Sequence, residues 1–148
     1  VCSAGLTEGL PKHLEGLEVL SHPECMGLLA AHQLGRVGVN LGQYPAILPV
    51  NYAMLGDDIV FRSALGAKLT AALEDAVVAF EVDAVERDQG VAWSVMVVGR
   101  AGWLAGGAER DQAARLPLAP LAPEPHDYFI RIVAERVSGR RFQVPPRA

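Results

Sequence analysis

Lysine is nearly absent from this 148-residue chain, in which Lys12 and Lys68 stand against eleven arginines. The formal net charge is −4 and the pI is near 5.5, so there is no basic stripe to neutralise the phosphates of a nucleic acid. Apolar runs fall short of the roughly 20 residues that span a bilayer, and residues 1–20 show no secretory signal pattern. We therefore expect a cytoplasmic protein that binds neither nucleic acid nor membrane.

Cysteine and the motifs of metal or nucleophilic chemistry are also scarce. Cys2 and Cys25 are isolated and have no CxxC spacing, which indicates reduced thiols. The four histidines are scattered and form no HExxH motif, so we expect no metal site. GxSxG, Walker A and dinucleotide-binding glycine patterns are missing as well. No catalytic residue follows from a motif.

The chain begins with weak periodicity and then shows a clear helix signal. We interpret residues 1–20 as a flexible N-terminal arm and 21–148 as a single domain. In SHPECMGLLAAHQLG, Ser21 and Glu24 have the spacing of a capping box, and Gly35 suits the helix end. The expected buried stripe of this helix consists of Met26, Leu29 and Ala30.

The remainder is rich in the β-branched and aromatic residues that favour strands. The expected strands lie at 36–41, 46–55, 59–63, 77–83, 91–105 and 127–142, with short helices at roughly 66–74 and 106–116. Long antiparallel strands in hairpin order usually close up, because closure removes open edges. We predict a mainly β fold, a small β-barrel of about six antiparallel strands with three short peripheral helices.

The stretch VFRSALGAKL suggests an anion site where a strand passes into a helix. The first N–H groups of a helix lack internal partners and favour an anion. Arg62 offers a guanidinium, Ser63 a hydroxyl and Lys68 a point charge near that helix start. The alternative is a solvated Lys68, with Arg62 paired to an acidic residue at position 57, 58 or 74.

Two further stretches, LPVNY and AWSVMVVGRA, place polar side chains among apolar neighbours. Asn51, Tyr52, Trp93 and Ser94 suit either the core and rim of a barrel or the lining of a flat ligand site. The residue types leave both interpretations open.

The stretches LGRVGV, PVNY, VFRSALGAKL, VAFEVD, WSVMVVGRA and RI…VSGRRF follow one another within residues 21–142. In this order they resemble the pyridoxamine 5′-phosphate oxidase-like family of FMN-binding split barrels, and most closely its actinobacterial, nitroimidazole-reductase-like branch. The resemblance implies a homodimeric split barrel with FMN in a groove at the subunit interface.

Carried over position by position, the resemblance implies that Arg62, Ser63 and Lys68 hold the FMN phosphate. It also implies that the edge of the isoalloxazine ring is lined by Pro49, Val50, Asn51 and Tyr52. Trp93 and Ser94 correspond to a stretch that reaches the flavin from the neighbouring subunit. A basic C-terminal strand that helps to close the site corresponds to Arg131, Arg140 and Arg141.

Some positions depart from the family pattern. Ala92 replaces a glycine and Val98 an arginine, while Leu121 and Phe129 replace tryptophans. The C-terminal signature of the true oxidases is absent, so we do not expect oxidation of pyridoxamine phosphate.

The resemblance favours an FMN-dependent oxidoreductase with an unknown small-molecule substrate, in which the flavin supplies the hydride chemistry. No acid–base residue is obvious, and the catalytic residues are unknown; Tyr52 or His126 is a candidate proton donor, and a proton from solvent is the alternative. Two alternatives stay open. One is the same fold with a deazaflavin, or haem, as cofactor. The other is a dimeric flavin-binding protein without turnover.

Overall fold

The computed structural model describes residues 16–63, 66–104, 106–118 and 128–145, without the side chains at 63, 66–68 and 70. Its elements, in chain order, are β1 (Leu17–Val19), α1 (His22–Ala31), β2 (Leu34–Leu41), β3 (Tyr44–Leu55), β4 (Asp58–Ser63), α2 (Gly66–Leu73), β5 (Val77–Glu86), the 3₁₀ helix η2 (Arg87–Gln89), β6 (Val91–Trp103), α3 (Ala108–Ala114) and β7 (Tyr128–Gln143). No helix in the described ranges is long and apolar enough to cross a membrane.

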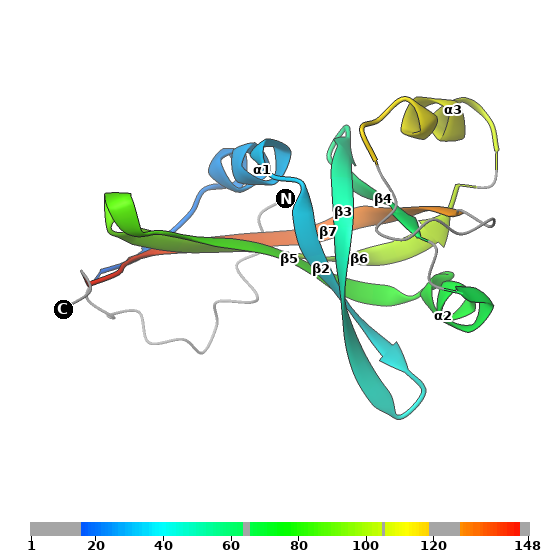
Figure 1. Cartoon of the computed structure of the whole chain (residues 1–148), viewed down its shortest axis with the longest axis horizontal. Coiled ribbons are helices and arrows are strands. Elements are labelled where there is room, and N and C mark those ends of the chain that lie inside the picture. The colour runs from blue at the N-terminus through cyan, green and yellow to red at the C-terminus, as the bar shows by residue number, and fades with distance from the viewer. Residues whose placement is uncertain (1–15, 64–65, 105, 119–127, 146–148) are drawn as a thin grey trace.

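Six antiparallel strands close into a barrel. The hydrogen-bonded order runs β7–β4–β3–β2–β5–β6, and β6 pairs in turn with β7. In Figure 1, β2 and β3 run across the long strands β5, β6 and β7, while α1 and α3 lie above them and α2 lies at the side. The predicted mainly β barrel with three short helices is confirmed.

A seventh strand extends the sheet beyond the barrel. β1 pairs with the C-terminal part of β7, with Leu17 opposite Phe142. Leu20, which follows β1, is buried in the main core. Residues 17–20, which the sequence analysis assigns to the N-terminal arm, therefore contribute to the sheet and the core. A three-residue strand escapes a periodicity argument because it is too short to show a period.

Helix α1 begins as expected and ends earlier. The Ser21 hydroxyl accepts a hydrogen bond from the Glu24 N–H at 3.3 Å, which confirms the predicted N-cap. The helix ends at Ala31, and its buried residues are Cys25 and Leu29, whereas Ala30 is exposed. The predicted stripe is therefore wrong at Ala30.

Gly35 belongs to β2 and does not end the helix. A Cβ atom at this position would lie 2.3 Å from Cζ of Phe80, a ring in the middle of the core. The glycine is needed for close packing of β2 on this ring. A tight glycine turn lies instead between β3 and β4, where Gly56 has φ +61° and Leu55 pairs with Asp58.

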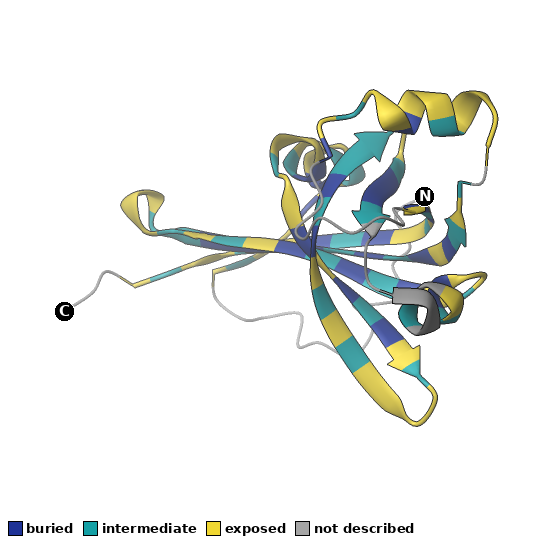
Figure 2. Cartoon of the chain, turned by 45° about the vertical axis from the view of Figure 1, so that its right-hand side comes forward, coloured by how far each residue is buried: buried dark blue, intermediate teal, exposed yellow. Residues whose placement is uncertain are grey.

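The long strands project from the barrel as an arm. The arm consists of the β5–β6 hairpin, the C-terminal part of β7 and β1, and it extends to the left in Figure 1. Figure 2 shows that burial is concentrated where the strands cross, and that the hairpin end of the arm is exposed. Buried residues inside the barrel form one large core cluster. A second cluster lies between α3 and the sheet and consists of Val60, Ala113, Leu118 and Phe129.

Candidate functional site

Strand β3 changes partners within the segment 49–52 that the sequence places at a ligand. Residues 44–51 pair with β2, whereas Tyr52–Leu55 pair with β4. Among the described strands, none pairs with residues 44–51 on the side opposite β2. We call this side of residues 44–50 the free edge of β3; the side chains of Pro49 and Asn51 point outward beside it.

Val50 and Tyr52 point into the barrel from the same segment and are buried. The Tyr52 hydroxyl donates a hydrogen bond to the carbonyl oxygen of Leu29 at 2.5 Å, and its ring packs edge-to-face on Phe80. Burial raises the pKa of Tyr52 to about 12. These two side chains stabilise the barrel, and the Tyr52 proton is already engaged, which argues against Tyr52 as a proton donor to a ligand.

Arg62 and Asn51 lie on the outer face of the sheet. Tyr52 and Phe61 are paired and both face the core, so the alternation of side chains directs their neighbours Asn51 and Arg62 outward. Arg62 lies over the ring of Phe129, its partner in β7, with Cζ 5.7 Å from the ring centroid. The structure therefore brings these two predicted site residues to one face.

The other two predicted phosphate ligands fall outside the described side chains. Ser63 is the last residue of β4, and Lys68 belongs to α2, which starts at Gly66. The strand-to-helix order at this corner is as predicted. The roles of both side chains stay predictions.

Trp93 and Ser94 lie on β6, close to α1 and not at the free edge of β3. The Trp93 side chain is 2% exposed and packs edge-to-face on His32, with the ring centroids 4.7 Å apart. Within the described part of the chain, its indole N–H has no hydrogen-bond acceptor. Ser94 is half-buried opposite Asp83 in β5. The role of Trp93 and Ser94 at a flavin of a neighbouring subunit stays a prediction.

Arg131 lies on β7 with its charge neutralised. Its Nε donates a hydrogen bond to the Asp58 carboxylate at 2.8 Å, and its Nη1 lies 2.7 Å from the Glu109 carboxylate. The hydrogen bond to Glu109, followed by that to Asp58, raises the pKa of the guanidinium. Arg131 therefore fixes α3 to the β3–β4 turn, and it can bind an anion only in competition with two carboxylates.

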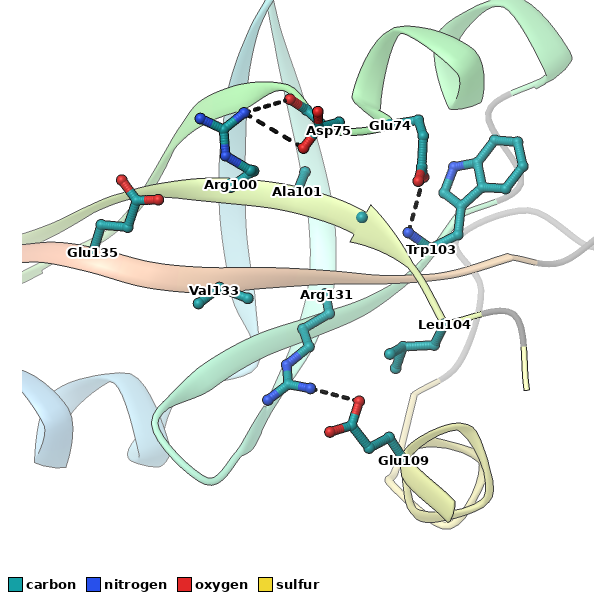
Figure 3. A pocket seen from close by; sticks show the side chains of 11 residues that line it. Glu74, Asp75, Arg100, Ala101, Trp103, Leu104, Glu109, Arg131, Val133 and Glu135 are labelled. Carbon is teal, nitrogen blue, oxygen red and sulfur yellow. Dashed lines mark hydrogen bonds and ion pairs between the residues drawn. The ribbon is translucent and has the colours of Figure 1, made fainter. Parts of the chain in front are cut away.

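A pocket of about 610 Å³ lies beside Arg131, on the outer face of β6 and β7. Figure 3 shows Arg100 directed towards Asp75 and Arg131 directed towards Glu109. Gly102 lies between them in the pocket wall, where a Cβ atom would meet nothing within 4 Å. Both arginines that line the pocket are thus held by acidic residues.

The remaining basic residues of the C-terminal strand lie on the arm. Arg141 pairs with Glu18 of β1 at 3.4 Å and lies 3.8 Å from Glu24 of α1. Arg140 is exposed. His126, the other side chain singled out as a proton donor, lies outside the described residues. Arg140 and Arg141 are therefore separated from Arg62 within one chain.

The acidic side chains of the pocket have no sequence signature. Glu74 and Asp75 follow α2, Glu109 lies on α3 and Glu135 on β7, so only the closed barrel brings them together. The spacing of these residues carries no periodic or motif signal. Phe129, which the sequence singles out only as a departure from the family pattern, lies next to the guanidinium of Arg62.

Comparisons with known proteins agree with this architecture. Residues 21–141 match the family described as pyridoxamine 5′-phosphate oxidase. An uncharacterised Mycobacterium tuberculosis protein, Rv0080, is 30% identical over 98% of each chain. A solved FAD-binding protein of Mycobacterium smegmatis is 30% identical over 86% of this chain and all of the other, with a TM-score of 0.76. A FAD-binding protein of Mesorhizobium loti is 26% identical over 84% of this chain and 97% of the other, with a TM-score of 0.70.

The matched segment covers α1, α2, α3 and nearly all of the barrel. It contains almost all of the predicted site residues and the free edge of β3. The chain therefore belongs to the pyridoxamine 5′-phosphate oxidase family of split barrels.

Proposed function

We propose that this protein binds a flavin nucleotide on the outer face of β3 and β4 and uses it to oxidise or reduce a small molecule. The observation that carries the proposal is the placement of Arg62 and Asn51 on one face, beside the free edge of β3. A guanidinium suits a phosphate, and a free strand edge supplies hydrogen-bonding groups for the polar rim of a flat ring. The printed descriptions of the Mycobacterium smegmatis and Mesorhizobium loti proteins support a flavin.

The identity of the flavin is part of the proposal. The family resemblance implies FMN, whereas both solved relatives are described as binding FAD. The two cofactors share the isoalloxazine ring and the first phosphate, so Arg62 serves either. A deazaflavin or haem stays the alternative, as does flavin binding without turnover.

The residues at this site provide groups that suit the binding of a flavin, but they provide few groups that can act as an acid or a base. Arg62 is held over the Phe129 ring, which positions its charge for a phosphate. When bound, the flavin supplies the hydride chemistry. The Tyr52 proton is engaged by Leu29, so no described tyrosine at this segment provides a proton to the ligand. We propose that protons reach the site from solvent.

Flavin titration of a double variant tests the phosphate assignment. Arg62→Ala with Lys68→Ala is expected to weaken FMN on the order of a hundredfold or more, because each charge-assisted contact is lost. Riboflavin has no phosphate, and its affinity is expected to change little. Arg136→Ala, an exposed arginine of β7, is the matched control. Equal losses for FMN and riboflavin would defeat the assignment.

The absorbance spectrum of the purified protein separates the cofactor alternatives. A flavin, a deazaflavin and a haem absorb in different bands, so the colour of the protein identifies the cofactor class. A colourless protein that takes up neither added FMN nor added FAD would contradict the proposal. Reduction of the bound flavin, followed by a panel of electron acceptors, then separates an enzyme from a binding protein.

A further inference from the structure

Phe129 contacts two guanidinium groups that come from different elements. Cζ of Arg62, on β4, is 5.7 Å from the ring centroid, and Cζ of Arg110, on α3, is 5.5 Å from it. Ala113, three residues after Arg110, is buried in the cluster that contains Phe129 and Val60. Residues three apart share a face of a helix, so the face of α3 that packs on the sheet also carries Arg110. Arg110 is therefore held at the sheet surface.

The charge of Arg110 is not offset by a carboxylate within the described ranges. Its neighbours Glu109 and Asp111 are one position away, so helical geometry directs them to other sides. Glu109 binds Arg131 at 2.7 Å, and Asp58 binds the same guanidinium. Asp58 on β4 and Glu109 on α3 are thus both committed to Arg131. A cation held beside an aromatic ring without a counter-ion favours an anionic ligand.

We propose that Arg110 is a second anion-binding residue next to Arg62, and that it selects a flavin with a diphosphate over one with a monophosphate. Because the two Cζ atoms lie 5.7 Å and 5.5 Å from one centroid, they are at most about 11 Å apart. A diphosphate has two linked phosphoryl groups, so each guanidinium can hydrogen-bond to one of them. A monophosphate offers a single group.

This inference rests on the proposed flavin binding and adds the distinction between FAD and FMN to it. The residue that distinguishes FAD from FMN then lies on α3. This helix lies outside the corner between β4 and α2 that the sequence predicts as the anion site.

Equilibrium titration of the full chain with riboflavin, FMN and FAD tests the inference. Arg110→Gln is expected to weaken FAD about ten- to hundredfold, and to leave FMN and riboflavin within about threefold. Arg110→Lys keeps the charge without the planar fork and is expected to recover part of the FAD affinity. Arg115→Gln, an exposed residue at the end of the same helix, is the matched control. Circular dichroism of each variant checks that the barrel is folded.

The outcomes separate this inference from the proposed function. If Arg110→Gln weakens FAD and FMN equally, or weakens neither, the inference is overturned and flavin binding stands. If the wild-type chain binds none of the three flavins, the proposed function fails, and inorganic pyrophosphate becomes the probe. Pyrophosphate binding that is weakened by Arg110→Gln and not by Arg115→Gln supports the two-arginine site. Absence of pyrophosphate binding then overturns it.

Discussion

The Tyr52 hydroxyl joins helix α1 to the barrel. It donates to the Leu29 carbonyl at 2.5 Å from a position that is 2% exposed. A phenolate at this place would lose its hydrogen bond and would be poorly solvated, so the neutral form is favoured. The protonation state of the Tyr52 hydroxyl is therefore coupled to the attachment of α1 to the barrel.

Tyr52→Phe tests this coupling through the pH dependence of stability. The pKa of Tyr52 rises from 10.0 to about 12 on folding, so the folded chain keeps a proton that the unfolded chain loses. The stabilisation is complete below about pH 10 and is lost as the pH rises through about 12. Tyr52→Phe is expected to lower the free energy of unfolding by about 1–2 kcal/mol at neutral pH and to remove this alkaline decline.

Urea unfolding at a series of pH values measures both effects. Tyr44→Phe, at the exposed start of β3, is the control. An alkaline decline of the same size in wild type and Tyr52→Phe would show that another group causes it.

Asp58 and Glu109 both bind Arg131, yet their contributions differ because their exposure differs. The Asp58 side chain is 15% exposed and also accepts the Ala134 N–H at 3.1 Å, whereas the Glu109 side chain is 58% exposed. Asp58→Ala leaves partly buried donors without an acceptor and is expected to cost about 1–3 kcal/mol of unfolding free energy. Glu109→Ala is expected to cost at most about 1 kcal/mol. Denaturant midpoints check this order, and equal losses would contradict it.

At the scale of the element, a bulge shapes the pairing of β6 with β7. Val98 pairs with Arg136 and Gly99 pairs with Ala134, so Glu135 is an extra residue on β7. A Cβ atom at Gly99 would lie 2.1 Å from the backbone oxygen of Val133. The absence of a side chain at Gly99 allows the two strands to approach, and the bulge places Glu135 at the pocket.

Gly99→Ala is expected to destabilise the protein by about 1–3 kcal/mol, because backbone must shift to admit the methyl group. Gly102→Ala, three residues further along β6, is the control, since a Cβ atom there meets nothing within 4 Å. Thermal unfolding of both variants measures the difference. Similar melting temperatures would mean that the bulge adapts without strain.

At the scale of the whole molecule, the arm carries an apolar row across four strands. The cross-strand partners are Val85 on β5, Ala92 on β6, Phe142 on β7 and Leu17 on β1. Val85 is 56% and Phe142 is 42% exposed. Apolar side chains on a projecting arm suit contact with a second copy of the chain. We propose that the arm takes part in the homodimer that the family resemblance implies.

Sedimentation tests the proposed dimer. The wild-type chain is expected to sediment as a dimer, and Val85→Glu as a monomer with an unchanged circular dichroism spectrum, because a charge is costly at an apolar interface. Val77→Glu, on the same strand within the barrel body and 54% exposed, is the control. A monomeric wild type that holds flavin at full affinity would contradict a site shared between subunits.

The local patterns of the sequence predicted most of the elements because each has a local cause. Alternating β-branched residues produced the six barrel strands, the Ser21 hydroxyl set the start of α1, and Gly56 set the β3–β4 turn. The prediction that Gly35 ends the helix is wrong, because the contact that requires a glycine at this position is not local. The residue that requires it, Phe80, is 45 positions away in the chain and meets it only across the closed barrel.

The sequence by itself determined the order of the strands and helices, the apolar interior and the basic strand end at Arg62, because periodicity and charge act between neighbours in the chain. The tertiary structure alone decided which side chains are buried in the core and which charged side chains are paired. Closure of the barrel turned Tyr52 and Trp93 inward, neutralised Arg131 with carboxylates from β4 and α3, and brought Arg110 to the ring that Arg62 also contacts. These pairings depend on distances between elements, which no spacing along the chain encodes.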